Sequence, residues 1–176
     1  ASPNMPVSSN ALQSTFGGGG QDGVLFKLDA SLTTIIWGTY FGGSAADAVY
    51  NIELNDAGDI YLAGGTRSTD LSITSNALQT TFQGGNADGF IALIDANGNT
   101  LNAATYFGTS GYDQCYFTDL DQEGNVYLFG QTNAPGTALI QNASYNIPNS
   151  GQFITKLDAG LTTTLISTRF GQGDGQ

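Results

Sequence analysis

The sequence of 176 residues contains no histidine and a single cysteine, Cys115. Serine–histidine and cysteine–histidine catalytic arrangements are excluded within these residues, because both need an imidazole. One cysteine also excludes an intrachain disulfide, and it leaves the redox compartment open. Cys115 falls inside a predicted strand, where we expect a small buried apolar residue rather than a reactive thiol.

Basic residues are scarce as well: four of them oppose fifteen Asp and Glu residues, which gives a net charge of −11. The four are Lys27, Arg67, Lys156 and Arg169. They lie far apart in the sequence, whereas binding to phosphate backbones needs clustered Lys and Arg. A nucleic-acid partner is therefore excluded, and the negative charge also opposes binding to anionic membranes.

Long hydrophobic runs are absent, since no stretch approaches the roughly 18 apolar residues of a membrane span. What the sequence does contain is 25 glycines and apolar segments rich in Ile, Leu, Val, Thr, Tyr and Phe. These residue types favour short β-strands separated by tight turns. Helical periodicity is not found.

The chain repeats itself with a period of 66 residues. Asn10-Ala11-Leu12-Gln13 recurs as Asn76-Ala77-Leu78-Gln79, and Thr39-Tyr40-Phe41-Gly42 recurs as Thr105-Tyr106-Phe107-Gly108. A third copy, Thr168-Arg169-Phe170-Gly171, follows after 63 residues. A period of this length is typical of repeat folds, in which neighbouring units bury a continuous core.

Each unit is predicted to hold four strands, which in the first unit span 24–29, 34–41, 48–55 and 59–66. Alternating apolar residues and glycine-containing turns indicate antiparallel hairpins. The predicted division has blades at 23–66 and 89–132, the first two strands of a further blade at 153–176, and inter-blade crossings at 1–22, 67–88 and 133–152.

This pattern favours an all-β fold, a β-propeller segment with four-stranded antiparallel blades and about two and a half blades in all. A sheet that is apolar on both faces needs a neighbouring sheet on each side, as stacked blades provide. A β-solenoid is the alternative, although solenoids usually have shorter repeats and fewer hairpins. Because the sequence starts in a crossing and stops inside its third unit, we expect it to be part of a larger protein.

Several motifs resemble the SBBP-type β-propeller repeats: Asn76-Ala77-Leu78-Gln79-Thr80-Thr81-Phe82, Asp88-Gly89-Phe90, Trp37-Gly38-Thr39-Tyr40-Phe41-Gly42-Gly43-Ser44 and Gly124-Asn125-Val126-Tyr127-Leu128. Such repeats are typical of large secreted or surface proteins of Bacteroidetes, many of them exported by the type IX secretion system. The resemblance covers nearly the whole chain. It implies a propeller and an extracellular or cell-surface location, and it implies no defined activity.

Two pairs of aspartates are candidates for catalysis or ligand binding: Asp22 with Asp47, and Asp88 with Asp113. Paired carboxylates can hydrolyse glycosidic bonds. These pairs recur with the repeat, however, whereas an active site is normally unique. Loop capping is therefore the preferred interpretation, and a carboxylate-based glycoside-active enzyme is the less favoured alternative.

One turn resembles a calcium loop, since Asp95, Asn97 and Asn99 place oxygen atoms at alternate positions around Gly98. The run lacks the bidentate glutamate of an EF-hand, and a hairpin turn explains the same residues without a metal. We therefore expect no cofactor and treat this loop as a weak calcium candidate.

Aromatic residues provide a further candidate site, because tyrosine and tryptophan rings stack on sugars. Tyr40 and Tyr106 recur at equivalent strand positions, which favours core packing, whereas Tyr112 falls in a loop. Tyr112 and Asp113 are thus the candidate residues for carbohydrate binding.

The preferred function is that of a non-enzymatic extracellular propeller segment, a scaffold or an interaction and adhesion surface of a larger bacterial secreted or surface protein. Expected partners are the remainder of the propeller and a protein or glycan at the cell surface. A carbohydrate-binding propeller is the alternative.

Overall fold

The computed structural model describes residues 3–171, and every regular element in that range is a β-strand. The ten strands are β1 (Gly23–Leu28), β2 (Ile35–Phe41), β3 (Asp47–Leu54), β4 (Ile60–Thr66), β5 (Asp88–Ile94), β6 (Leu101–Phe107), β7 (Asp113–Leu120), β8 (Val126–Thr132), β9 (Gln152–Leu157) and β10 (Thr164–Phe170). Residues 1–2 and 172–176, at the ends of the first predicted crossing and the last predicted unit, lie outside the described residues.

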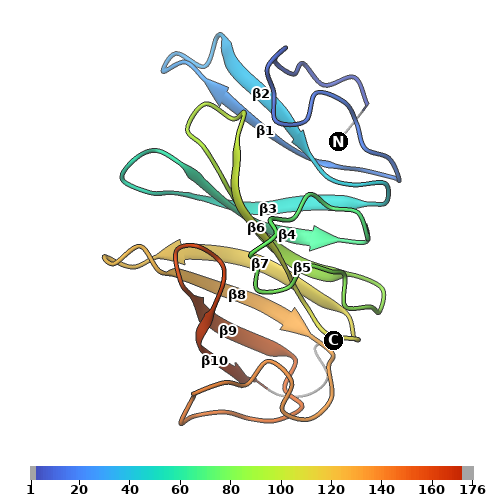
Figure 1. Cartoon of the computed structure of the whole chain (residues 1–176), viewed down its shortest axis with the longest axis vertical. Helices are drawn as coiled ribbons and strands as arrows, with labels where there is room; N and C mark the ends of the chain where they lie inside the picture. Colours follow the sequence, from blue (N-terminus) through green and yellow to red (C-terminus); the bar gives the residue numbers. More distant parts are fainter. Residues whose placement is uncertain (1–2, 172–176) are drawn as a thin grey trace.

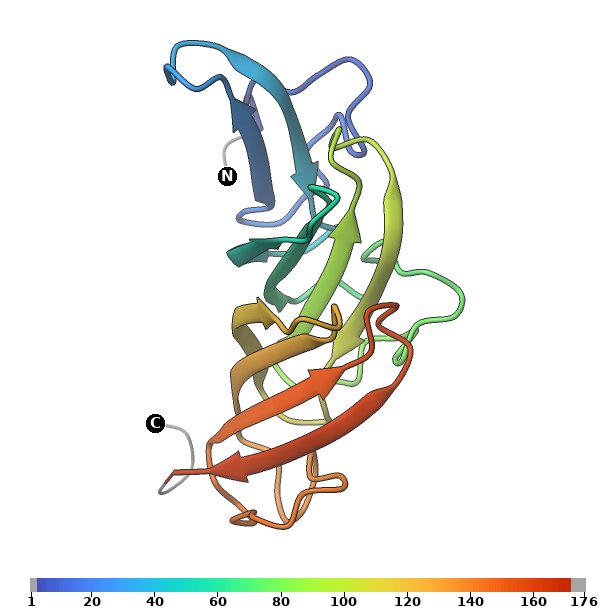
Figure 2. The same ribbon diagram turned by 90° about the vertical axis from the view of Figure 1, so that its left-hand side faces the viewer.

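The strands form three antiparallel sheets, which consist of β1–β2, β3–β6 and β7–β10. In each sheet the strands follow one another in chain order, so every sheet is a meander. The sheets are stacked one above another along the long axis of the molecule (Figure 1), and the side view shows their twisted strands (Figure 2). The prediction of an all-β propeller segment with about two and a half blades is confirmed.

The boundaries between the sheets are shifted by two strands from the predicted boundaries between the blades. β4 pairs with β5 along its whole length, from Ile60↔Ile94 to Thr66↔Asp88, so one sheet takes two strands from each of two repeats. The half sheet is consequently β1–β2, at the opposite end of the chain from the predicted one. The long segments 67–87 and 133–151 join strands of one sheet, and the short segments 42–46 and 108–112 connect neighbouring sheets.

Two hydrophobic cores lie between the sheets. β4 is buried on both faces, because Ile60 and Leu62 belong to the core beside β1–β2, whereas Tyr61 and Ala63 belong to the core beside β7–β10. Tilted phenylalanine pairs bridge both interfaces, Phe41–Phe90 in the first core and Phe107–Phe153 in the second, each with 5.3 Å between ring centroids. Stacking of sheets, rather than hairpin formation alone, therefore stabilises the fold.

In each of the two larger sheets, a glycine is required opposite a phenylalanine of the neighbouring strand. Gly64 lies opposite Phe90 in the β4–β5 pair, and a Cβ atom there would come within 2.6 Å of the phenylalanine ring. Gly130 lies opposite Phe153 in the same way, with a corresponding distance of 2.3 Å. The missing side chain provides the space that the aromatic ring of the next repeat occupies.

Candidate functional site

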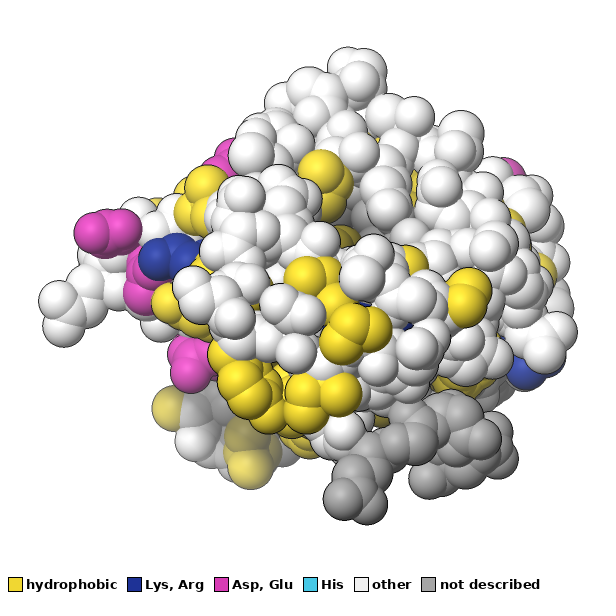
Figure 3. Space-filling model, turned by 90° about the horizontal axis from the view of Figure 1, so that it is seen from below, with side chains coloured by type: hydrophobic (Ala, Val, Ile, Leu, Met, Phe, Trp, Pro, Cys, Tyr) yellow, Lys and Arg dark blue, Asp and Glu magenta, His cyan; other side chains and the backbone are white. Residues whose placement is uncertain are grey.

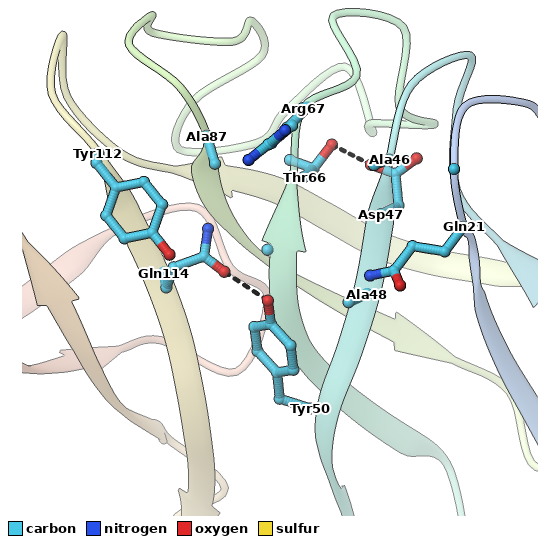
Figure 4. Close-up of a pocket in the computed structure, with 12 residues that line it drawn as sticks. Gln21, Ala46, Asp47, Ala48, Tyr50, Thr66, Arg67, Ala87, Tyr112 and Gln114 are labelled. Carbon is cyan, nitrogen blue, oxygen red and sulfur yellow. Dashed lines mark hydrogen bonds between the residues drawn. The ribbon is translucent and has the colours of Figure 1, made fainter. Parts of the chain in front are cut away.

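A pocket of about 360 Å³ opens between the middle sheet and the last sheet, where β3 and β7 begin and β4 ends. It lies at the lower end of the volume range of ligand-binding pockets. The side chains that line it come from both sheets and from loops around them, including the loop before β1 that carries Gln21 (Figure 4). They include Gln21, Asp47, Tyr50, Thr66, Arg67, Tyr112 and Gln114.

Tyr50 enters the pocket from a β-bulge, because the β3–β4 register skips this residue between Val49 and Asn51. A bulge re-aims a side chain relative to the regular alternation of the strand. The hydroxyl of Tyr50 donates a hydrogen bond of 2.8 Å to Oε1 of Gln114 on β7. Its ring packs against that of Tyr116, with centroids 5.6 Å apart. These contacts join the two sheets at the floor of the pocket.

Arg67 and Tyr112 border the upper part of the pocket (Figure 4). Arg67 follows the last residue of β4 and is exposed, and its backbone N–H donates to the carbonyl of Ala46. Tyr112 directly precedes β7, and its backbone N–H donates to Oδ1 of Asn133. A guanidinium group and two phenol rings therefore surround a space that reaches solvent.

The four candidate aspartates lie below the surface, with exposed fractions of 2% for Asp22, 1% for Asp47 and 0% for Asp88 and Asp113. Each carboxylate accepts a backbone N–H from the loop before its strand, from Gly17, Gly43, Gln83 and Thr109 respectively. Asp47 also accepts hydrogen bonds from the hydroxyls of Thr66 and Ser68. These contacts fit the preferred interpretation of the aspartates as loop caps.

Asp88 and Asp113 face an unfavourable environment at their second oxygen atoms. In the described part of the chain, Oδ1 of each is buried and accepts no hydrogen bond. The pKa of Asp88 is raised to about 7, chiefly because the carboxyl is buried; the N–H of Gln83 lowers the pKa, and the nearby Asp113 raises it. Asp113 does not share the pocket with Tyr112, although the two residues are adjacent in sequence.

The loop that resembles a calcium site is a hairpin turn in which the carboxylate of Asp95 is already hydrogen-bonded. It accepts the backbone N–H groups of Asn97, Asn99 and Thr100, and also the side-chain amide of Asn97. Across residues 3–171, no three His, Cys, Asp or Glu side chains gather in a way that suits a metal ion. The turn accounts for the Asp and Asn residues of this motif.

The recurring aromatic residues are buried, as predicted. Tyr40 and Tyr106 are both 1% exposed, and Trp37 is 8% exposed with its Nε1–H donating to the carbonyl of Ala96. Cys115 is fully buried in the second core, and this burial raises the pKa of its thiol. Tyr112 is only partly buried, and it is the loop aromatic that reaches a pocket.

A second surface feature is the apolar outer face of β7–β10, which is the side of the last sheet that points away from the middle sheet. Hydrophobic side chains gather there in the view from below (Figure 3). Phe117 is 59% exposed, and its ring lies 6.0 Å from that of Phe129, which in turn lies 6.0 Å from that of Phe170. We use the name outer face for Phe117, Tyr127, Phe129, Ile154, Ile166 and Phe170.

Comparison with known proteins found no protein-family model and no curated protein that matches this chain. Among residues 3–171, no helix has the length and apolar character that a membrane crossing requires. The stacked meanders themselves define the class of protein: the chain is a β-propeller segment.

Arg67 and Gln114 are pocket residues that the sequence interpretation did not single out. The sequence does contain a signal for both residues, because the repeats differ at these two positions. The residue 66 positions after Arg67 is Asn133, and the residue 66 positions before Gln114 is Ala48. Side chains that the blade needs for packing recur, so the positions that change between repeats are the ones to examine for a specific role.

Proposed function

We propose that this propeller segment is a non-enzymatic scaffold and interaction module. The observation that carries the proposal is the outer face, because the same positions of the preceding repeat form a sheet–sheet interface. Tyr61, Ala63 and Ile91 are at most 3% exposed against β7–β10. Their counterparts on the outer face, Tyr127, Phe129 and Ile154, have the same apolar character and are open to solvent.

The partner that fits the outer face is another four-stranded blade, as expected from the rest of a propeller. Apolar faces of this kind associate because each Å² of apolar surface that is removed from water stabilises the complex by about 25 cal/mol. The buried aspartates support a role without catalysis, because their carboxylates hold loops instead of lining the pocket, apart from Asp47.

We further propose a location outside the cell or on its surface, in a bacterial protein of the SBBP-repeat type with type IX secretion. The support is the order of repeated motifs, from Asn76-Ala77-Leu78-Gln79 through Asp88-Gly89-Phe90 to Gly124-Asn125-Val126-Tyr127-Leu128. Fractionation of the cells that produce the protein tests this part. Recovery of the protein in the cytoplasm alone would contradict it.

The scaffold proposal is tested by self-association, measured by light scattering during size-exclusion chromatography up to about 1 mM chain. We expect the chain to associate through its outer face, since a second copy supplies an apolar sheet surface. The double variant Ile154→Lys/Ile166→Lys is expected to be monomeric, because burying two lysines is costly. Leu54→Lys, at a 57% exposed position of the middle sheet, is the matched control.

Two results would count against the scaffold proposal. One is a wild-type chain that stays monomeric over the whole concentration range. The other is a double variant that associates as strongly as the wild type while the circular dichroism spectrum shows intact β-structure.

A further inference from the structure

The pocket between the middle and last sheets combines residues that the repeat preserves with residues that it changes. Tyr50 has its counterpart in Tyr116, and Asp47 has its counterpart in Asp113. By contrast, Tyr112 and Gln114 replace Ala46 and Ala48 of the first unit. The blade therefore folds with alanine at these two positions, and packing of the sheet does not require the larger side chains.

Arg67 is the basic residue of the pocket in a chain whose net charge is −11. The basic side chains of the last sheet are engaged elsewhere. Lys156 forms an ion pair of 2.7 Å with Asp121, and Arg169 is buried and donates to the carbonyl of Ser150. In residues 3–171 the Lys156–Asp121 contact is the single ion pair, so no carboxylate of the described chain pairs with the exposed guanidinium of Arg67.

Gln114 is a buried polar side chain that reaches the pocket, with an exposed fraction of 3%. Its oxygen accepts the hydroxyl of Tyr50, which holds the amide plane in place. In Figure 4 the amide nitrogen lies on the side of Arg67 and the oxygen on the side of Tyr50. A ligand in the pocket thus meets both an oriented amide donor and a guanidinium group among the lining side chains.

Three properties of the pocket define the ligand. The guanidinium group favours a carboxylate, which it can bind through two parallel hydrogen bonds. The rings of Tyr50 and Tyr112 favour the C–H face of a sugar, and the amide of Gln114 favours a hydroxyl group. The strongly negative net charge opposes a polyanion, so a ligand with one carboxylate fits best.

We propose that this pocket binds a single uronic-acid residue of an otherwise neutral glycan. Arg67 pairs with the carboxylate, Tyr112 contacts the sugar ring, and Gln114 donates to a ring hydroxyl. This binding site is additional to the scaffold role of the outer face, because the two surfaces share no residue.

The experiment is a titration of the whole chain with methyl β-glucuronide, followed by calorimetry or by NMR shifts of pocket amides. We expect a Kd of about 1 mM or tighter, and weaker binding as ionic strength rises, because salt screens the Arg67 contact. Methyl β-glucoside, which lacks the carboxylate, is expected to bind at least about tenfold more weakly.

Two variants use residues that the repeat itself supplies. Arg67→Asn introduces the residue found at Asn133, and Tyr112→Ala introduces the residue found at Ala46, so both are expected to fold. Each should weaken glucuronide binding by about tenfold or more. Lys27→Asn removes an exposed positive charge outside the pocket and should leave the affinity unchanged.

The proposal is overturned if methyl β-glucuronide fails to bind at about 10 mM, or if folded Arg67→Asn binds it as tightly as the wild type. It is also overturned if N-acetylglycine binds as tightly as the glucuronide. That outcome would show that the pocket recognises a carboxylate without a sugar ring, as at a peptide C-terminus. None of these results depends on the oligomeric state that tests the scaffold proposal.

Discussion

Four aspartates lie just before or at the start of strands β1, β3, β5 and β7, and each holds the loop that precedes its strand. What recurs at these four positions is a hydrogen bond from a loop N–H to the carboxylate, which is a structural role and not a catalytic one. Asp88 differs from an ordinary cap because its pKa is raised to about 7, chiefly by burial. The folded chain therefore holds a proton on Asp88 that the unfolded chain releases near pH 4.

Protonation of Asp88 makes stability depend on pH. Since the folded pKa lies above the unfolded value, ionisation opposes folding, so the contribution of Asp88 to the free energy of unfolding decreases from about pH 4 to pH 7 and then stays low. Asp88→Asn keeps an oxygen for the N–H of Gln83 and removes the charge. We expect the variant to gain up to about 4 kcal/mol relative to wild type between pH 4 and pH 8.

Urea unfolding of wild type and Asp88→Asn at a series of pH values measures this difference. Asp56→Asn, at an exposed turn residue, serves as the control for removal of a carboxylate. Parallel stability curves for wild type and Asp88→Asn would contradict the expected proton uptake.

At the scale of the elements, a side chain of each unit fastens a long loop to its sheet, and the type of this side chain differs between the units. The hydroxyl of Tyr106 donates to the carbonyl of Ser68 and accepts the N–H of Leu71, which fastens the 67–87 segment to β6. Tyr40 accepts the N–H of Met5 in the first unit. In the third unit the counterpart is Arg169, whose guanidinium donates to the carbonyls of Gly136, Ala138 and Ser150. An arginine thus replaces a tyrosine and still holds the loop by its backbone.

Removal of one loop contact should be measurable. Tyr106→Phe leaves the N–H of Leu71 without its buried partner, and the carbonyl of Ser68 keeps only the hydroxyl of Thr66 at 3.5 Å. We therefore expect a loss of about 1–3 kcal/mol in the free energy of unfolding. Limited proteolysis should show faster cleavage within residues 67–87. Tyr145 is 65% exposed, so Tyr145→Phe should change neither quantity. If Tyr106→Phe has the stability and the cleavage rate of the wild type, the hydroxyl of Tyr106 does not hold the loop.

The sequence predicts the strands well but not which strands share a sheet. The predicted strand at 34–41 and the observed β2 (Ile35–Phe41) differ by one residue, because alternation and turn residues are local signals. Strand pairing is not a local signal, because the period of 66 residues does not show which four successive strands form one sheet. The length of the 67–87 segment suggested a link between sheets, and the contacts of Tyr106 explain why such a long loop stays within one sheet.

The candidate site was predictable only in part, for a related reason. The sequence predicts Tyr112 as a site residue because it places this tyrosine in a loop, and it predicts the carboxylates because of their chemistry. Burial of Asp113 follows from its position at the first residue of β7, under the preceding loop. Arg67 and Tyr112 line one pocket only because β4 and β7 of neighbouring sheets pack against each other, and no local sequence pattern contains this arrangement.

At the scale of the whole molecule, the strands of each sheet in residues 3–171 pack mainly against the neighbouring sheet in the stack, as in other repeat proteins. The first sheet has two strands and joins the rest mainly through Leu25, Trp37 and Phe41. Stability in such an array is a sum of local terms, so the unit with the smallest interface is expected to open first.

Trp37 reports on this order of unfolding, because it is the single tryptophan and lies in the first sheet. In a urea titration we expect tryptophan fluorescence to change at a lower urea concentration than the far-UV circular dichroism of all three sheets. Coincident transitions would instead show that the array unfolds as one cooperative unit.

The phase of the sheets also has a consequence for how the repeats can diverge. Gly64 belongs to one repeat and the ring that fills its missing side chain, Phe90, belongs to the next, and the same holds for Gly130 and Phe153. If recombination exchanges one whole repeat, the incoming repeat must supply the phenylalanine that pairs with the glycine of the preceding repeat and the glycine that pairs with the phenylalanine of the following one. We therefore expect substitutions at these paired positions of β4–β5 and β8–β9 to occur together in adjacent repeats.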